Sequence, residues 1–225
     1  MLIAIDQGHG ATTNPYPDGI HCEGFQMYQL GYLLYQELKA MNKYSLRCTR
    51  NKSTDDPTLA QRGSYAKGAD LFISLHSNAA ADTSVDRIVV IPTFTNTEAT
   101  FRNFCRELGD LVKNVLNCKG QTQIFERTYT DVNDGLTKDY YGVIRNAVAA
   151  GCSNVLILEH SFHTNPEKAA LLSQTGVLKI LAKKEAEKID SWLSPAATPS
   201  YWGRLPNANV TYKDLWEILH DPHAD

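Results

Sequence analysis

Three short apolar runs, each followed within a few residues by a polar side chain suited to catalysis, constrain this chain more than any other feature. The runs and the residues that follow them are 2–5 with His9, 71–75 with His76, and 155–158 with Glu159. Runs of this length and composition are typical of buried parallel strands. Because the carboxyl ends of such strands meet at one edge of an open sheet, we expect these three side chains to lie close together.

The segments between the runs alternate between helical and strand-like patterns. Apolar residues at three- and four-residue spacing predict helices over 23–42, 58–68, 98–118, 136–150 and 177–192. Short apolar stretches predict further strands over 44–49, 87–91 and 124–129. This alternation predicts an α/β fold in a single domain, with a mostly parallel sheet, helices on both faces and the site at the C-terminal ends of the strands.

Length and composition indicate one sizeable domain. The chain has 225 residues, of which 43% are hydrophobic and 21% charged, as is ordinary for a globular protein. The segment SPAATPS over 194–200 has the composition of a linker. We therefore expect a catalytic domain over 1–193 and a short C-terminal tail over 201–225, which either packs back on the domain or docks elsewhere.

Charge and hydropathy narrow the choice of partners. The formal net charge of −3 gives no electrostatic case for nucleic acid, and no apolar stretch approaches transmembrane length, so we expect no membrane insertion. The N-terminus leads directly into the first predicted strand without the basic and apolar segments of a secretory signal, which favours synthesis in the cytoplasm. The five cysteines have no metal-binding spacing and are expected to be structural thiols.

Two imidazoles and a carboxylate at one sheet edge suit a zinc ion. Zinc in hydrolases takes three protein ligands and leaves a fourth position for water. His9 and His76 are two candidate ligands, and the segment after His9 offers His21, Cys22 and Glu23 as the third. We favour Glu23 because it opens the first predicted helix, where its charge suits the helix dipole. A carboxylate would also keep the ion more Lewis-acidic than a thiolate.

Glu159 is the candidate catalytic base. Zinc lowers the pKa of its water to about 7 and polarises the substrate carbonyl. A further group must take the proton of that water and pass it to the leaving nitrogen, and the third strand brings Glu159 to the same edge. Taken singly, His9 and His76 are also typical of turns and Glu23 of helix starts. Their convergence with Glu159 predicts a catalytic site with one Zn²⁺ per chain.

Several segments, taken together and in order, resemble a known family. They are IAIDQGHG over 3–10, Glu23, LAQR over 59–62, ADLFISLHSNA over 69–79 and LILEHSFHTNP over 156–166. This set resembles the zinc-dependent N-acetylmuramoyl-L-alanine amidases, and more narrowly the type 3 amidases of bacterial autolysins and phage endolysins. The resemblance covers about residues 1–193.

The resemblance implies that His9, Glu23 and His76 bind zinc and that Glu159 is the catalytic carboxylate. It implies hydrolysis of the amide bond between N-acetylmuramic acid and the L-alanine of peptidoglycan. The partner would be the glycan strand with its stem peptide, and the chain would act on the cell wall after release or secretion. Both an autolysin and an endolysin remain open as its setting.

Substrate-binding residues are less sharply indicated. The segment 140–145 resembles a family segment near the peptide-binding groove, which makes Tyr141 and Arg145 candidates for contact with the stem peptide. Asn78, close after His76, is a second candidate, although Asn is equally suited to stabilising its own turn.

The sequence departs from the family pattern at two places. Gln7 stands where a small residue is usual, so its side chain is expected to reach into the site or hydrogen-bond within it. His160 and His163 follow Glu159 and are either additional site groups or residues that satisfy local contacts. Arg62 and Asp70 are expected to form a structural pair under the sheet.

Two other functions remain open: a zinc peptidase acting on another amide, and a wall-binding module without turnover. The order of the candidate residues and the segment Asp6-Gln7-Gly8-His9 argue against the first. A retained Glu159 argues against the second, because burying a carboxylate without a role is costly.

Overall fold

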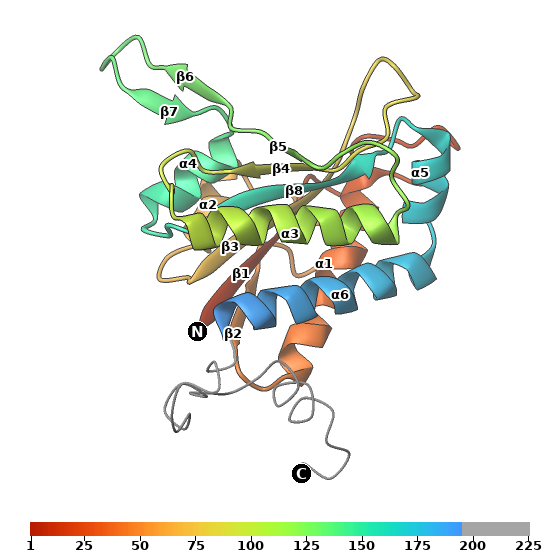
Figure 1. The fold of residues 1–225 in the computed structure, drawn as a ribbon, viewed down its shortest axis with the longest axis horizontal. Coiled ribbons are helices and arrows are strands. Elements are labelled where there is room, and N and C mark those ends of the chain that lie inside the picture. The colour runs from red at the N-terminus through yellow and green to blue at the C-terminus, as the bar shows by residue number, and fades with distance from the viewer. Residues whose placement is uncertain (195–225) are drawn as a thin grey trace, which may run out of the picture. The chain divides into compact units, whose positions relative to one another are not determined.

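A six-stranded sheet organises residues 1–194, which are the residues that the computed structural model describes (Figure 1). The strand order is β2-β1-β3-β8-β4-β5. The strands are β1 (Leu2–Gln7), β2 (Ser45–Cys48), β3 (Leu71–Asn78), β4 (Val89–Pro92), β5 (Gln123–Ile124) and β8 (Val155–Phe162). Strands β2, β1, β3 and β8 are mutually parallel, whereas β4 runs antiparallel to β8 and parallel to β5. The prediction of a mostly parallel sheet is confirmed.

Helices cover both faces of this sheet, as predicted. They are α1 (Glu23–Ala40), α2 (Leu59–Ser64), α3 (Ala99–Val115), α4 (Gly142–Ala149), α5 (Pro166–Leu172) and α6 (Thr175–Leu193). Helices α2 and α4 pack against each other and against one face, where Phe72, Ile144 and Ile157 share a buried apolar cluster. Helices α1, α3 and α6 lie on the other face (Figure 1).

Domain boundaries are only partly covered by the described residues. Met1–Asp190 form one unit, and a second unit begins at Ser191. The predicted linker over 194–200, apart from Ser194, and the predicted tail over 201–225 lie outside the described residues. Within residues 1–194, no helix combines the length and the apolar character that a bilayer crossing requires.

The prediction was wrong between residues 124 and 150. The predicted strand over 124–129 is divided between β5 and β6 (Thr128–Thr130), and the predicted helix over 136–150 begins only at Gly142. Its first residues form β7 (Thr137–Asp139), which pairs antiparallel with β6. Asp134 and Gly135 explain the difference, since an Asp-Gly pair favours a hairpin turn and Gly135 takes a φ of +71°. Figure 1 shows this β6–β7 hairpin extending away from the sheet.

Strand β8 continues past its predicted end to Phe162. His76 of β3 pairs with Glu159, but Asn78 pairs with Phe162, so β8 contains an extra residue between these pairs. Ser161 has a φ of +62°, as expected of a residue in a β-bulge. The register therefore places Glu159 directly beside His76.

Candidate active site

The end of β1 is shaped by a glycine that lets two strands approach. Gly8 donates its backbone N–H to the Leu75 carbonyl at 3.0 Å, and a Cβ at Gly8 would lie 2.4 Å from Cε1 of His76. Any other residue would therefore displace the His76 ring. The next residue, His9, has a φ of +59°, and this left-handed turn directs the chain away from the sheet edge.

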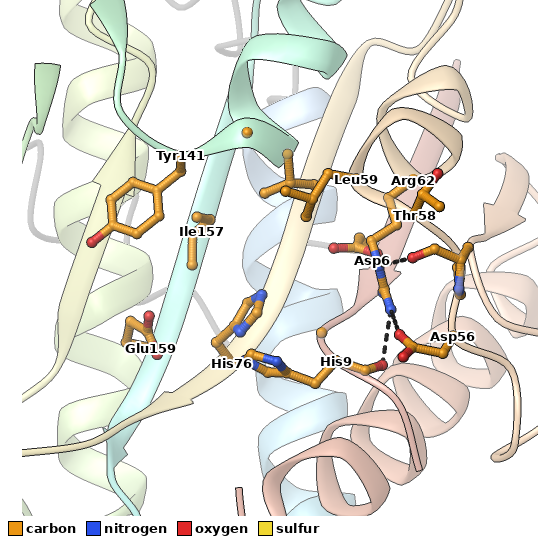
Figure 2. Close-up of a pocket in the computed structure, with 14 residues that line it drawn as sticks. Asp6, His9, Asp56, Thr58, Leu59, Arg62, His76, Tyr141, Ile157 and Glu159 are labelled. Atoms are coloured by element: carbon orange, nitrogen blue, oxygen red, sulfur yellow. Dashed lines mark hydrogen bonds and ion pairs between the residues drawn. The ribbon is translucent and has the colours of Figure 1, made fainter. Parts of the chain in front are cut away.

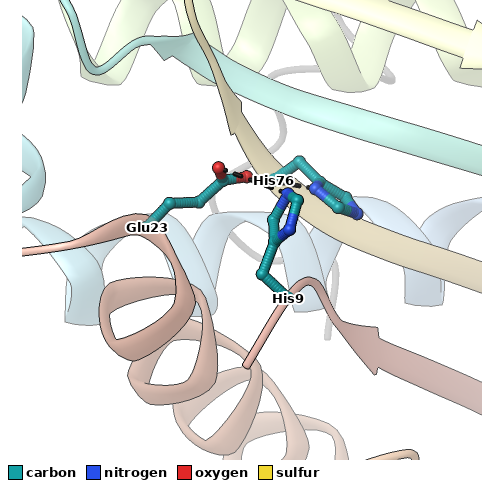
Figure 3. A group of neighbouring side chains, drawn as sticks. All are labelled: His9, Glu23 and His76. Carbon is teal, nitrogen blue, oxygen red and sulfur yellow. Dashed lines mark hydrogen bonds and ion pairs between the residues drawn. The ribbon is translucent and has the colours of Figure 1, made fainter. Parts of the chain in front are cut away.

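His9, Glu23 and His76 meet at this edge (Figure 3). Nε2 of His9 lies 3.4 Å from Oε2 of Glu23, and Nδ1 of His76 lies 3.0 Å from Oε1 of Glu23. The three donor atoms lie within 4.8 Å of one another. Of the alternatives for the third position, His21 is paired with Asp18 at 2.6 Å and the Cys22 thiol donates to the Ala11 carbonyl.

Glu23 is buried and carries the negative charge of this group. Burial alone would raise the pKa of Glu23, but hydrogen bonds from His76 and His9 outweigh it and hold that pKa well below its usual range. Burial alone would lower the pKa of His76, but the Glu23 carboxylate raises it to about 9. The carboxylate is therefore ionised, as a metal ligand must be.

Neighbouring residues hold the Glu23 carboxylate from both sides. Nδ2 of Asn14 donates to Oε2 of Glu23 at 2.6 Å, and the backbone N–H of Ser77 donates to Oε1 at 2.9 Å. Asn14 has a φ of +57°, a conformation that costs less for Asn than for most residues. His163 lies behind Ser77, 3.0 Å from its hydroxyl, with its ring stacked on Tyr16. His163 thus supports the site through Ser77.

A buried hydrogen-bond chain sets the orientation of His76. Nε2 of His76 lies 3.1 Å from the Ser74 hydroxyl, which in turn donates to the Asp6 carboxylate. Since the hydroxyl has one proton and gives it to Asp6, it must accept from Nε2–H of His76. Nδ1 is then the nitrogen that faces Glu23. Holding an imidazole through its other nitrogen is how proteins orient metal-binding histidines.

A cavity of about 510 Å³ opens beside this group (Figure 2). His9, His76 and Glu159 form a polar end of this cavity. Leu59 and Ile157 contribute apolar side chains to its wall. Its lining residues, ordered along the chain, are Asp6, Gly8, His9, Asp56, Pro57, Thr58, Leu59, Arg62, His76, Tyr141, Gly142, Val143, Ile157 and Glu159. A substrate can therefore place a polar group at one end and rest on an apolar wall.

Glu159 faces this cavity and is distinct from the three clustered side chains. It is 9% exposed, and among residues 1–194 its Oε2 has no hydrogen-bond partner. Burial raises the pKa of Glu159 to about 7. A carboxyl group with a pKa near 7 exchanges protons readily at neutral pH, as an acid–base catalyst requires.

Arg62 does not pair with Asp70, contrary to the prediction. Its guanidinium donates to Asp6 at 2.9 Å and to the His9 carbonyl at 2.9 Å, while Asp70 accepts the backbone N–H of Leu2 at 2.7 Å. The capping box of α2, formed by Thr58 and Gln61, fixes the helix that aims Arg62 at the cavity. Arg62 thus ties the loop carrying His9 to the sheet.

Gln7 and His160 lie away from the cavity because side chains alternate along a strand. Asp6 faces the cavity, so Gln7 faces the opposite side, where its Oε1 accepts the backbone N–H of Arg50 at 3.1 Å. The prediction that Gln7 reaches into the site was wrong. His160, next to Glu159, lies 2.9 Å from Oε1 of Glu185 on α6.

Of the three candidates for substrate contact, Tyr141 lines the cavity, whereas Asn78 and Arg145 do not. Oδ1 of Asn78 accepts the backbone N–H of Ala79 at 2.8 Å, which is a local turn contact. The Arg145 guanidinium donates to the carbonyls of Asp139 and Tyr140 and lies over the Tyr129 ring. Their roles toward a substrate stay predictions.

Asn14, Ser77 and the α2 residues that line the cavity were missed as site residues. Asn14 lies in a loop, and nothing in its spacing links it to Glu23. The Thr58-x-x-Gln61 pattern was the available signal for the start of α2 beside the cavity.

Comparison with known proteins identifies the family. A family model described as N-acetylmuramoyl-L-alanine amidase matches residues 3–191. No curated protein matches the chain. Among solved structures of similar fold, Cwp6 from Clostridium difficile has a TM-score of 0.71 and 19% identity, and the match covers 85% of this chain and 29% of that one. The catalytic domain of the N-acetylmuramoyl-L-alanine amidase CwlV from Bacillus (Paenibacillus) polymyxa has a TM-score of 0.68 and 18% identity, and the match covers 86% of this chain and 98% of that one. The N-acetylmuramoyl-L-alanine amidase from C. difficile 630 has a TM-score of 0.70 and 16% identity, and the match covers 87% of this chain and 98% of that one.

At these identities the solved structures establish the fold, including the central sheet and its flanking helices. The match over residues 3–191 covers nearly all the residues that the structure describes. The chain belongs to the N-acetylmuramoyl-L-alanine amidase family.

Proposed function

We propose that this protein hydrolyses the amide bond between N-acetylmuramic acid and L-alanine in peptidoglycan with one Zn²⁺ per chain. The family supplies the reaction class. The observation that carries the metal requirement is the convergence of donor atoms from His9, Glu23 and His76 at the polar end of a cavity that also contains Glu159.

The donor set fits zinc in type and spacing. Two imidazole nitrogens and one carboxylate are an established catalytic zinc set. Tetrahedral zinc with ligand bonds of about 2.1 Å separates its donors by about 3.4 Å. Nε2 of His9 lies 3.4 Å from one Glu23 oxygen and Nδ1 of His76 lies 3.0 Å from the other, and the three donor atoms lie within 4.8 Å of one another, which is close to this spacing. Nδ1 of His76 and Nε2 of His9 must each be free of a proton to bind the ion.

Nε2 of His9, Nδ1 of His76 and the Glu23 carboxylate would hold the ion. Bound there, zinc supplies Lewis acidity toward a carbonyl oxygen and toward water. Glu159 accepts a proton from the attacking water and delivers it to the departing alanine nitrogen. Its raised pKa, about 7, suits both directions of this transfer. The Ser74 and Asn14 contacts keep His76 and Glu23 in place while Glu159 exchanges its proton.

The cavity walls would position the scissile bond. Leu59, Val143 and Ile157 provide the apolar contact that excludes bulk water from the reacting end. Asn78 and Arg145 are proposed to contact parts of the substrate that extend beyond the cavity, since neither side chain lines it. The cell wall is the proposed place of action, reached by release or secretion as an autolysin or an endolysin.

The test measures zinc content and the cleavage products of purified cell wall for the wild type and Glu159→Gln. We expect about one zinc per chain in both proteins and new L-alanine amino termini from the wild type alone. A chelator should abolish cleavage and added zinc should restore it. Glu187→Gln, an exposed glutamate on α6, is the matched control.

Two outcomes would overturn the proposal. Cleavage at another amide, identified by mass spectrometry of the released fragments, would indicate a zinc peptidase. Zinc binding with retention on the cell wall but without products would indicate a binding module. Unchanged turnover in Glu159→Gln would remove this residue from the reaction.

A further inference from the structure

The β6–β7 hairpin is exposed along its length but anchored at its base. Tyr129, Val132, Leu136 and Tyr140 are all exposed apolar or aromatic side chains. At the base, the backbone N–H of Tyr140 donates to the Arg127 carbonyl at 2.7 Å. Two-stranded hairpins are marginally stable alone, so this base determines where the hairpin points.

Further contacts fix the base to the protein body. The buried Asp139 carboxylate accepts the Thr93 hydroxyl at 2.8 Å and the backbone N–H of Phe94 at 3.1 Å. Arg145 of α4 donates to the Asp139 carbonyl at 2.8 Å. The base of the hairpin is thus held both by β4's following loop and by α4.

The hairpin base is continuous with the cavity. Strand β7 leads through Tyr140 to Tyr141, the N-cap of α4, and Tyr141 lines the cavity (Figure 2). The two tyrosine rings meet edge to face, with centroids 5.4 Å apart. A ligand extending from the cavity past Tyr141 therefore meets Tyr140 next.

Arg127 packs on Tyr140. Its guanidinium lies over the Tyr140 ring, 3.5 Å from the centroid, so the ring fixes the position of the cation. Arg127 is exposed, and within residues 1–194 it has no carboxylate partner and donates no side-chain hydrogen bond. A stacked guanidinium with free N–H edges is suited to receive a carboxylate in a two-pronged contact.

The other charged groups of this region are already engaged. Lys138 is paired with Asp131 and Asp134 at 2.7 and 2.6 Å, and Glu126 is paired with Arg102 at 2.6 Å. Arg145 is hydrogen bonded to the carbonyls of Asp139 and Tyr140. Among the described residues of the hairpin base, Arg127 is therefore the cation whose guanidinium makes no hydrogen bond.

From this arrangement we propose that Arg127, carried on Tyr140, is a binding subsite for a carboxylate of the stem peptide. The inference rests on the proposed function. In that substrate the lactyl carboxyl of N-acetylmuramic acid is consumed in the scissile amide, so the sugar there has no charge. The negative charge lies on the peptide, which extends outward from the alanine nitrogen. Charge complementarity thus selects the peptide rather than the glycan strand as the occupant.

The test compares two soluble muramyl peptides, one with free peptide carboxylates and one with these groups amidated. For the wild type, amidation should raise KM about fivefold with kcat unchanged, the effect of one exposed charge pair. Arg127→Ala should raise KM for the free peptide by a similar factor and lose the sensitivity to amidation. Arg127→Lys should restore part of the sensitivity of KM to amidation. Arg106→Ala, an exposed arginine of α3, is the matched control and should behave as wild type.

Equal KM values for wild type and Arg127→Ala, with the amidation effect retained, would overturn the subsite. If Arg127→Ala also lowers Tm, the KM values of Arg127→Lys decide whether the subsite exists, because this variant keeps a cation on the Tyr140 ring.

Absence of any hydrolysis by the wild type would instead contradict the proposed function. In that case binding of both peptides to Glu159→Gln, measured by calorimetry, still decides the subsite: a preference for the free peptide that Arg127→Ala removes supports it, and equal affinities overturn it.

Discussion

The edge of the sheet that carries the candidate ligands and the β6–β7 hairpin are built on opposite principles. Glu23 is 2% exposed and is held by His76, Asn14 and the Ser77 backbone, which come from different segments of the chain. On the hairpin, by contrast, Val132 is 95% exposed and every residue of β6 is exposed.

This difference separates two tasks. Groups that must hold a metal and move protons need fixed positions, and fixed positions come from buried, fully bonded neighbours. Groups that receive a variable, extended substrate can lie on an exposed element with a rigid base. Substitutions at the ligand edge should therefore change metal affinity and stability, whereas substitutions on the hairpin should change only substrate binding.

The largest effect is expected at Glu23. Glu23→Gln removes the negative charge between His9 and His76, so zinc affinity should fall by more than about 100-fold and hydrolysis should fall with it. Competition with a zinc chelator measures the affinity. Glu37→Gln, on the same helix α1, is the control. Undiminished zinc binding by Glu23→Gln would mean that another residue completes the ligand set.

Asn14 should have the next largest effect, because it bonds the Glu23 carboxylate without binding zinc itself. Asn14→Ala should lower zinc affinity by about 10-fold, the lower end of the range for residues that orient ligands. Asn14→Gly accommodates the φ of +57° without strain and should show the same loss, which separates the amide from the backbone. Normal affinity in Asn14→Gly would assign the effect to strain.

The His160–Glu185 pair predicts a pH dependence of stability. Burial disfavours the charged ring, but the Glu185 carboxylate at 2.9 Å raises the pKa of His160 above its usual value. Since the pKa is about 6.5 in unfolded chains, the pair's contribution is complete below about pH 6.5 and is lost as pH rises through the folded pKa. The Tm of the wild type should therefore fall more between about pH 6 and pH 8 than that of Glu185→Gln. An equal change of Tm with pH in the wild type and in Glu185→Gln would contradict this role of the pair.

The smallest effect is expected at the hairpin tip. The double substitution Val132→Ser and Leu136→Ser changes side chains that are 95% and 61% exposed, so the free energy of unfolding should change by no more than about 0.5 kcal/mol. Zinc affinity should not change at all. Denaturant unfolding measures the free energy of unfolding, and competition with a zinc chelator measures zinc affinity. A clear loss of zinc would show that the two regions are coupled.

Local sequence patterns located most of the fold. The apolar runs at 2–5, 71–75 and 155–158 became β1, β3 and β8, and helical spacing located α1 and α3 to within three residues at each end. These patterns succeed because burial of a periodic apolar face requires no knowledge of distant residues. The pattern failed around β6 and β7, where exposed residues carry no such periodicity.

The candidate site was predictable where it depended on strand ends and unpredictable where it depended on side-chain direction. Parallel strands place their ends at one edge, so His9, His76 and Glu159 could be grouped from sequence. The partners of Arg62 and the direction of the Gln7 side chain could not be predicted from sequence. They depend on which face each strand presents and on which helix covers that face.

The sequence by itself thus determined the parallel sheet, the order of its main helices and the residues at its functional edge. Tertiary structure alone decided the strand register that sets Glu159 beside His76, the contact of Asn14 with Glu23, and the stacking of Arg127 on Tyr140. The physical reason is how far apart in the sequence the interacting residues lie. Periodicity and strand ends are properties of neighbouring residues, whereas these contacts join segments whose approach is set by how the packed layers fit together.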